Sequence, residues 1–416
     1  MKTNILFLSA LISANCLSAQ VNETVSMTAG YANDNYYTLE DGNEVSIARD
    51  NWDLAFASNS LGGASSTVRI NGGMGTNCWL YNNDITQWAS LDTTNFNWSA
   101  NQLVNSDASW TTGAFENTTP ASAFDLGWGT YSLVTHTVEG DKIFILKLAN
   151  GAYKKLIINS LISGVFSFQY ADLNGANPVT SSLTKSDYLD KNFGYYSLQN
   201  DQTIDRDPLS DSWDILFTKY VTDLGGGTYY PVTGVLANRG VSVAQVNNVG
   251  NVNTVSYSNQ SFDSTNISVL GYDWKSYSFG SGSYVITDSL VYFVGTTSGD
   301  VFKIIFTAFG GSANGDFIFT KEKVYTVSVA EAKEKTKILD VYPNPASENL
   351  NITFAGGAEQ TLLSIYDVSG KEVFQKQINN IGLNQENIDV SNLDKGIYIL
   401  MLTTENSNSS KKIIIQ

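Results

Sequence analysis

The residues that most often perform chemistry are scarce in this sequence of 416 residues. It has one histidine, His136, and Cys78 is the only cysteine beyond the first 19 residues. It contains no H-E-x-x-H metal motif, no G-x-S-x-G nucleophile motif and no glycine-rich phosphate loop before a helix. Paired carboxylates stay open as an alternative, because any two of the many acidic residues could meet in the fold. The scarcity of acid–base groups predicts a protein that is not an enzyme.

Two aspartates lie beside tryptophans in similar surroundings. Asp53 follows Trp52, and Asp214 follows Trp213. Both are candidate carboxylates for chemistry. We expect them instead to accept hydrogen bonds from backbone or turn groups next to their tryptophans.

The composition indicates a protein that works outside the cell. Charged residues make up only 15% of the chain, against about 25% in typical domains. The net charge of −16 argues against nucleic acid and anionic lipid as partners, since both attract basic patches. Beyond the N-terminal leader, the sequence has no apolar run of the roughly 20 residues that a membrane span requires.

The N-terminus has the order of a secretory signal. Lys2 precedes an apolar run at residues 5–12, and Leu17-Ser18-Ala19 precedes Gln20. This order predicts a signal peptide at residues 1–19 that is cleaved between Ala19 and Gln20. A lipid-modified Cys16 is the alternative, but Asn15 stands where such a site needs a small residue. Cleavage after Ala19 leaves Cys78 alone, so no disulfide forms within the mature chain.

Residues 338–416 contain strand patterns separated by turn signals. Pro343 and Pro345 fix φ and lack an N–H donor, so the chain there is extended, at a strand start or a sheet edge. Asp367-Val368-Ser369-Gly370 lies between two strand-like runs and favours a tight reversal. Asp394-Lys395-Gly396 repeats this turn chemistry before an uncharged apolar run. The pattern predicts a small immunoglobulin-like β-sandwich.

This segment resembles the type A C-terminal sorting domain of cargo that the type IX secretion system of Bacteroidota exports. The matching elements are P-N-P, I-Y-D-V-S-G-K, L-x-x-G-I-Y and the basic last strand, in the family order. The resemblance implies passage through the periplasm, recognition by the outer-membrane secretion machinery, and an extracellular or cell-surface location. The positions that carry it are Pro343, Asn344, Pro345, Asp367, Gly370, Gly396, Lys411 and Lys412.

The region between the leader and this segment contains an internal repeat. Tyr36-Tyr37-Thr38-Leu39 precedes N-W-D-L-A-F, and Tyr195-Tyr196-Ser197-Leu198 precedes S-W-D-I-L-F. Tyr196 follows Tyr37 by 159 residues, and Trp213 follows Trp52 by 161 residues. Two matches at nearly one offset predict two β-rich domains, at residues 20–190 and 191–325, with a linker at 326–337.

The two repeats resemble the HmuY family, secreted haem-binding proteins of the same bacteria. The resemblance rests on the four segments W-D-I-L-F-T-K-Y at 213–220, T-G-V-L-A-N-R-G-V at 233–241, W-K-S-Y at 274–277, and Y-F-V with G-D-V-F-K-I-I-F-T at 292–307. The first copy matches at its W-D-L-A-F start and at residues 142–170, with a diverged middle. The resemblance implies an all-β fold of two tandem HmuY-like domains, with haem as a ligand.

The family pattern places a histidine after an aromatic-serine pair, and a second histidine completes the axial pair on the iron. In this chain the pairs are Tyr277-Ser278 in the second copy and Tyr131-Ser132 in the first. Phe279 and Leu133 follow them, and neither side chain ligates iron. His136 lies three residues beyond Leu133. With Met74, from a glycine-rich loop, it would form a His/Met haem site in the first copy; a surface or strand-end imidazole is the alternative. The second copy has no histidine or methionine and binds haem by neither scheme.

Glycan binding is the other ligand hypothesis. Exposed aromatic rings stack on sugar faces, and four tryptophans, with Trp79 and Trp88 as the leading candidates, cluster in the diverged middle of the first copy: Trp79, Trp88, Trp98 and Trp110. Alternatively these four cover loops, while others anchor the sheets: Trp52, Trp128, Trp213 and Trp274. An uncharged polar surface would also suit adhesion. We therefore predict an exported, non-enzymatic binding protein, to which the residues themselves assign no cofactor or metal.

Overall fold

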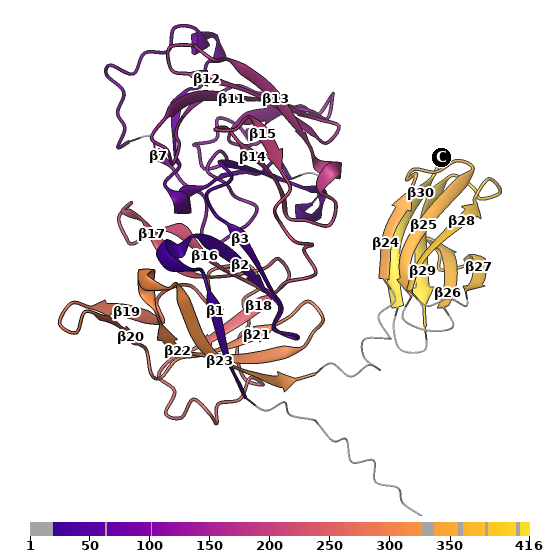
Figure 1. The fold of residues 1–416 in the computed structure, drawn as a ribbon. Coiled ribbons are helices and arrows are strands. Elements are labelled where there is room, and N and C mark those ends of the chain that lie inside the picture. The colour runs from indigo at the N-terminus through magenta and orange to yellow at the C-terminus, as the bar shows by residue number, and fades with distance from the viewer. Residues whose placement is uncertain are drawn as a thin grey trace, which may run out of the picture. The chain divides into compact units, whose positions relative to one another are not determined.

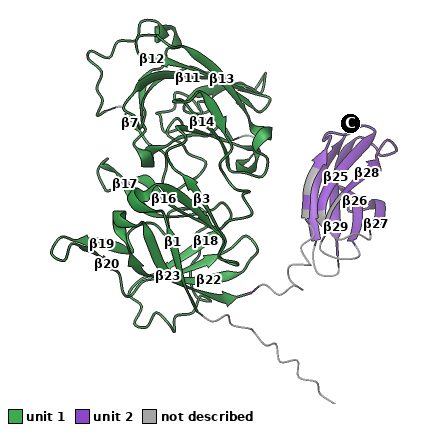
Figure 2. Cartoon of the chain, viewed as in Figure 1, with its two compact units in different colours: residues 1–325 green, residues 326–416 purple. Residues whose placement is uncertain are grey.

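The computed structural model describes residues 20–62, 65–100, 102–326, 337–356, 361–378, 382–404 and 408–416. The expected leader, with Ala19 at its cleavage site, lies outside these residues, as does nearly all of the expected linker at 326–337. Gln20 is the first described residue. The chain forms two compact units, residues 1–325 and residues 326–416 (Figure 2).

The predicted all-β fold is confirmed. Strands and short 3₁₀ helices, labelled η, are the regular elements of the described residues. β12 (Val165–Asp172) shows why: Phe166, Phe168 and Tyr170 alternate with more exposed side chains, and this period of two places one face of the strand in a core. No helix in the described part of the chain is long and apolar enough to cross a membrane.

The first unit contains two lobes of similar build. The first lobe consists of β4 (Leu54–Ala57), β5 (Val68–Ile70), β6 (Asn77–Asn82), β7 (Gln102–Leu103), β8 (Gly129–Tyr131), β9 (Val138–Gly140), β10 (Ile143–Lys147), β11 (Tyr153–Ile162), β12, β13 (Val179–Thr184), β14 (Phe193–Ser197) and β15 (Gln202–Ile204), with η2 (Asn59–Leu61), η3 (Gly72–Met74), η4 (Ile85–Trp88) and η5 (Lys185–Tyr188).

The second lobe is built from two separate parts of the chain. These are β1 (Val21–Ser26), η1 (Ala29–Tyr31), β2 (Asn33–Tyr37) and β3 (Glu44–Ala48), followed by β16 (Ile215–Asp223), β17 (Tyr229–Ala237), β18 (Ser242–Val246), β19 (Lys275–Ser278), β20 (Ser283–Ile286), β21 (Val291–Gly295), β22 (Val301–Phe309), η6 (Gly311–Ala313) and β23 (Asp316–Tyr325).

The sheets of the two lobes have matching strand orders. The large sheet runs β13-β12-β11-β10-β6-β7 in the first lobe and β1-β23-β22-β21-β18 in the second. The small sheet runs β15-β14-β4-β5 in the first lobe and β3-β2-β16-β17 in the second. Each lobe therefore repeats one architecture, as the sequence repeat predicts for these strands.

The chain begins in the second lobe, builds the whole first lobe and then returns. β1 pairs with β23, so the first and last strands of the unit lie side by side (Figure 1). β2 pairs with β16, with Tyr37 opposite Ile215, while β14 pairs with β4. Strands from both sides of the expected boundary at residue 190 thus share one sheet. The Tyr-Tyr strand of each sequence copy therefore pairs with the Trp-Asp strand of the other copy.

Each lobe has its own hydrophobic core. Trp128 lies in the first core, where it has no exposed surface, and Trp274 lies in the second, where 1% is exposed. Trp274 stacks on Phe306 with ring centroids 4.0 Å apart. These two tryptophans anchor their sheets as expected. Cys78 is a free, buried thiol in the first core.

The second unit is a β-sandwich, as predicted. Its sheets run β24-β25-β28 and β27-β26-β29-β30 around a core of mostly aliphatic side chains. The strands are β24 (Lys337–Tyr342), β25 (Asn349–Gly356), β26 (Thr361–Asp367), β27 (Glu372–Ile378), β28 (Gly382–Asp389), β29 (Gly396–Thr403) and β30 (Asn408–Ile415).

Candidate ligand-binding site

His136 lies in the exposed turn between β8 and β9. Its φ of +56° is a left-handed conformation that non-glycine residues seldom adopt. The Oη of Tyr131 lies 2.8 Å from its Nδ1, so a phenol already occupies one ring nitrogen. The position is that of a surface imidazole at a strand end, the alternative that the sequence left open.

Met74 ends η3, and its side chain is half-buried. η3 packs against β16 and β17 of the second lobe, whereas β9, next to His136, pairs with β11 of the first lobe. The two proposed haem ligands therefore lie on elements with different packing partners. The glycines around Met74 have another role, because they let this loop approach β16 closely.

Gly73 makes the closest of these approaches. A Cβ atom there would lie 1.9 Å from the carbonyl oxygen of Lys219. We expect Gly73→Ala to lower the free energy of unfolding by about 2–4 kcal/mol, because backbone must move to admit the methyl group. Urea unfolding measures this. Gly250→Ala is the matched control, since a Cβ there meets nothing within 4 Å; equal losses in the two variants would contradict the explanation.

The four clustered tryptophans do not form one flat platform. The Nε1 of Trp79 donates to the carbonyl oxygen of Trp98 at 2.7 Å, and the two rings meet edge-on at 5.0 Å. The Nζ of Lys155 lies 4.6 Å from the ring centroid of Trp88. Trp110 lies elsewhere, against Phe193 and with its Nε1 bonded to the carbonyl oxygen of Ala237. Protein groups thus contact a face or an edge of each ring.

The two aspartates beside tryptophans accept backbone hydrogen bonds, as predicted. The Oδ2 of Asp53 accepts from Leu198 N, and the Oδ2 of Asp214 accepts from Leu39 N, both at 2.8 Å. Burial raises the pKa of both carboxyls, and these hydrogen bonds oppose the shift. Each aspartate therefore ties a Trp-Asp strand to the Tyr-Tyr strand of the other copy.

The second lobe has an open groove that the sequence analysis missed. It lies against hairpins β16–β17 and β19–β20 and has a cavity volume of about 330 Å³, at the lower end of the roughly 300–1,000 Å³ usual for small-ligand sites. Its wall holds five tyrosines, two lysines and four other residues: Tyr31, Tyr230, Tyr272, Tyr277, Tyr284, Lys219, Lys275, Leu224, Pro231, Val232 and Thr233. Tyrosines are frequent throughout this chain, so their spacing gave no signal for the groove.

Tyrosine rings from both hairpins remain accessible in this groove, which we call the tyrosine groove. Tyr230 on β17 is 56% exposed, and Tyr277 on β19 is 47% exposed. The ring of Tyr277 meets that of Tyr284 edge-on at 5.2 Å. Burial and the neighbouring Tyr284 raise the pKa of Tyr31. The groove therefore offers flat apolar faces with phenol oxygens at their edges.

Lys275 supplies an unusual cation to the groove. Its Nζ donates to the carbonyl oxygen of Thr233 at 2.6 Å and lies 4.2 Å from the ring centroid of Trp274. Burial lowers its pKa to about 7, although nearby Asp273 opposes the shift. The ammonium is therefore charged in weakly acidic solution and largely neutral in weakly basic solution.

The C-terminal motif residues hold the sandwich together. Asn344, between Pro343 and Pro345, accepts a hydrogen bond at its Oδ1 from Ile414 N and donates from Nδ2 to the carbonyl oxygen of Lys412. The P-N-P segment is thereby fastened to β30, which contains Lys411 and Lys412.

One of the two predicted turns of this unit is present, at residues 367–370. The other is not found at Asp394-Lys395-Gly396, because the turn before β29 lies at residues 391–392. The Oδ1 of Asp367 accepts from the backbone N of Ser369 and of Lys371, and Gly370 has a φ of +85°. Gly396 is the first residue of β29. The turn chemistry read from the sequence therefore sets the hairpin between β26 and β27.

Comparison with protein families matches two parts of the chain. The family described as "Secretion system C-terminal sorting domain" matches residues 340–416, and the family described as "HmuY protein" matches residues 30–170. The chain carries a sorting domain and a HmuY domain. It is cargo of a type IX secretion system and is therefore secreted or displayed on the cell surface. A search of curated proteins found no match.

The HmuY domain does not coincide with one lobe. Residues 30–170 run from β2 to β12, so the match begins in the second lobe and ends in the first. It includes both Met74 and His136. The matched range covers one HmuY domain, whereas the sequence repeat predicted two.

Three solved structures are similar over parts of their length. Dimeric latent PorU from Porphyromonas gingivalis is 9% identical, with 67% of this chain and 26% of that chain covered and a TM-score of 0.19. The BSP domain of a biofilm associated protein is 12% identical, covering 98% and 68%, with a TM-score of 0.17. PorZ, a surface component of the P. gingivalis type IX secretion system, is 11% identical, covering 75% and 46%, with a TM-score of 0.16. This chain spans about a quarter of the PorU chain, and TM-scores this low support no inference.

Proposed function

We propose that this exported protein is a non-enzymatic binding protein and that its second lobe is a second, diverged HmuY-like domain. The matching strand orders of the lobes support the second domain. So does the segment W-D-I-L-F-T-K-Y, which forms β16 and the residues before it. In this proposal the lobe with the open groove binds the ligand.

The tyrosine groove is the observation that carries this function. It combines accessible aromatic rings from two hairpins with the ammonium groups of Lys219 and Lys275. A ligand that fits has flat faces and acidic substituents. No group of three or more His, Cys, Asp or Glu side chains that could hold a metal ion is found among the described residues, and binding needs none.

Ferric porphyrin, or haem, is the ligand of this class that we favour. Its flat ring would pack between Tyr230 and Tyr277, and its two carboxylates would pair with the lysines. A phenolate oxygen is an established axial ligand of haem iron. The groove thus offers iron a ligand that does not depend on histidine, whereas His136 and Met74 lie on elements with different packing partners.

The charge on Lys275 should make porphyrin binding depend on pH. Below pH 7 the ammonium pairs with a ligand carboxylate, and above pH 7 it loses its proton. We expect the affinity for metal-free protoporphyrin IX to fall about tenfold from pH 6 to pH 8.5, since a charged hydrogen bond contributes about 1.5 kcal/mol. Fluorescence titration measures the affinity, and the missing iron keeps phenolate ligation out of the comparison.

Lys275→Met should bind weakly at both pH values and show little pH dependence. Lys154→Met is the matched control, because Lys154 pairs with Asp172 in the first lobe, away from the groove. An unchanged pH dependence in Lys275→Met would mean that another group binds the carboxylates. Absence of saturable binding at either pH would remove the porphyrin from the proposal.

A further inference from the structure

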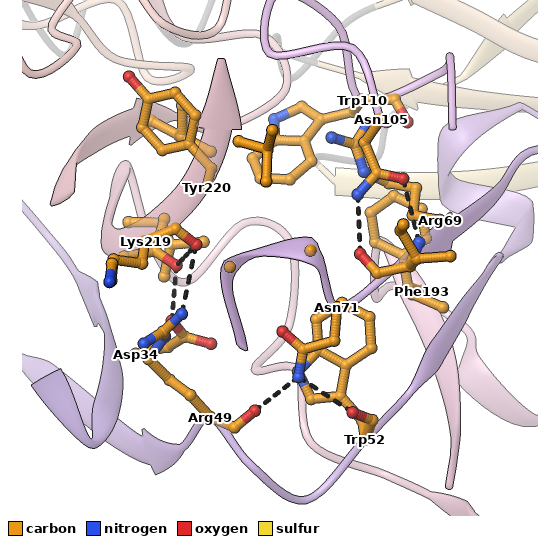
Figure 3. Close-up of a pocket in the computed structure, with 18 of the residues that line it drawn as sticks. Asp34, Arg49, Trp52, Arg69, Asn71, Asn105, Trp110, Phe193, Lys219 and Tyr220 are labelled. Atoms are coloured by element: carbon orange, nitrogen blue, oxygen red, sulfur yellow. Dashed lines mark hydrogen bonds and ion pairs between the residues drawn. The ribbon is translucent and has the colours of Figure 1, made fainter. Parts of the chain in front are cut away.

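A second pocket lies where the two lobes meet, and we call it the seam pocket (Figure 3). Its cavity volume is about 80 Å³. The first lobe contributes Trp110, Phe193 and Tyr195 to its wall, and the second lobe contributes Tyr36 and Tyr220. His136 and Met74, which the sequence suggested as haem ligands, do not line it.

The chain passes from the second lobe to the first after β3 and returns after β15. Both of these crossing segments lie at the pocket. Arg49 lies on the outgoing crossing after β3, and Arg206 lies on the return crossing after β15. Asp34 on β2 binds both: its Oδ1 is 3.0 Å from Arg49 Nε, and its Oδ2 is 3.0 Å from Arg206 Nη2. Thr218 Oγ1 donates to Asp34 Oδ1 at 2.6 Å. These three bonds engage both oxygens of the Asp34 carboxylate.

The donors of the seam pocket are not fully satisfied. Among the described residues, Arg206 Nε and Trp52 Nε1 are buried and have no hydrogen-bond partner. Arg206 is only 6% exposed, and its guanidinium carbon lies 5.7 Å from the ring centroid of Trp52. Buried donors in folded proteins nearly always have an acceptor. Two such donors on adjacent side chains that line one pocket indicate a missing acceptor there.

The charges around the pocket favour an acceptor that is negative. Its wall holds three cationic side chains and two carboxylates: Arg49, Arg69, Arg206, Asp34 and Asp107. Lys219 also lines the pocket, but its Nζ lies 5.7 Å from the ring centroid of Tyr31 in the tyrosine groove. Asp207 lies behind the wall, where the hydroxyl groups of Tyr36 and Tyr195 donate to it at 2.6 Å, and burial raises its pKa. The wall itself therefore has one cation more than it has carboxylates, in a chain with a net charge of −16.

The geometry points to a small acidic sugar of the uronate class as the ligand of the seam pocket. Its carboxylate accepts from Arg206 Nε and Trp52 Nε1, and its ring packs on the aromatic wall. Its hydroxyl groups bond to polar groups of the wall, such as Ser106. Because both crossings end at this pocket, a bound uronate also ties the two lobes together. This inference is independent of the tyrosine groove.

Isothermal titration of the mature full chain with D-glucuronate and D-galacturonate tests the proposal. We expect saturable binding of at least one of them, and at least tenfold weaker binding of D-glucose and D-galactose, which lack the carboxylate. Bound uronate should also slow hydrogen exchange at η3 and β2, which flank the pocket. Absence of uronate binding, or equal binding of the neutral sugars, would overturn the proposal.

Trp52→Phe removes one unpaired donor and keeps an aromatic ring, so it should weaken uronate binding at least tenfold. Trp213→Phe is the matched control: its Nε1 is also buried and unpaired, but Trp213 does not line the pocket. Circular dichroism checks that both variants fold. Equal effects of the two substitutions would overturn the role of Trp52. Porphyrin titration of Trp52→Phe separates this site from the groove, and there we expect no change.

Discussion

Replacing Tyr37 by alanine should remove protection against hydrogen exchange from the second lobe and leave the first lobe protected. Tyr37 is near the N-terminus, yet only 1% of it is exposed, in the core of the second lobe. Its ring meets Phe217 and Phe319 edge-on at 6.0 and 5.8 Å. Loss of such a ring costs about 3–5 kcal/mol. Native-state hydrogen exchange resolves which strands open.

Tyr196→Ala is the matched variant, because Tyr196 takes the same place in the first lobe, where its ring meets Phe168 at 4.9 Å. It should open β4 and β12 and spare β16 and β23. Two domains that follow each other along the chain would give the opposite pattern for Tyr37→Ala, with β4 losing its protection first. That result would contradict the threading of the first unit.

Deleting residues 408–416 should reduce the exported protein at least tenfold and leave it in the periplasm. These residues include β30, which lies at the edge of its sheet and buries Ile413 and Ile415 in the core of the sandwich. Ala346 also donates to and accepts from this strand, through bonds with Ile414 and Gln416. Without β30 the sandwich loses an edge strand and part of its core, and we expect the secretion machinery to need the folded unit. Immunoblots of periplasm and culture medium measure the effect.

A single surface change in the same unit controls for altered charge. Lys376→Gln removes a partly exposed cation that pairs with Glu386, away from the last strand. Export of this variant should match that of the unchanged protein. Normal export after the deletion of residues 408–416 would show that the sorting signal lies elsewhere.

Much of the architecture could be predicted from local patterns. The Asp367 turn depends on hydrogen bonds between near neighbours, and the two Trp-Asp strands begin as runs of apolar residues. The prediction of an extended segment at Pro343 and Pro345 is wrong, because residues 343–345 bend after β24 ends at Tyr342. The repeat offset also predicted that the same strands occur twice. The roles of Asp53 and Asp214 followed because a buried carboxylate beside a strand needs backbone donors.

The pairing between copies could not be read from the sequence. Tyr37 and Tyr196 lie in nearly identical segments, so each could join either Trp-Asp strand with similar side-chain contacts. The pairing is seen only in the fold, where β2 joins β16 and β14 joins β4. The candidate sites were hidden for a related reason, since each gathers residues that are far apart in the sequence.

The sequence suggested His136 and Met74 as haem ligands, whereas the polar side chains of the groove are mainly those of tyrosines and lysines. Its tyrosines come from η1, β17, β19, β20 and the segment before β19. No short motif links them. Only the fold shows that Tyr230 and Tyr277 line the same groove.

Titration of the mature chain with haemin, followed by absorption spectroscopy, tests the central claim most directly. We predict a saturable shift of the Soret band and a visible band of phenolate-bound ferric haem. Tyr277→Phe should lose that band and bind at least tenfold more weakly. Tyr131→Phe, at the matching position of the first lobe, and His136→Ala should behave like the unchanged protein. No saturable shift, or a shift lost in His136→Ala and kept in Tyr277→Phe, would contradict the account.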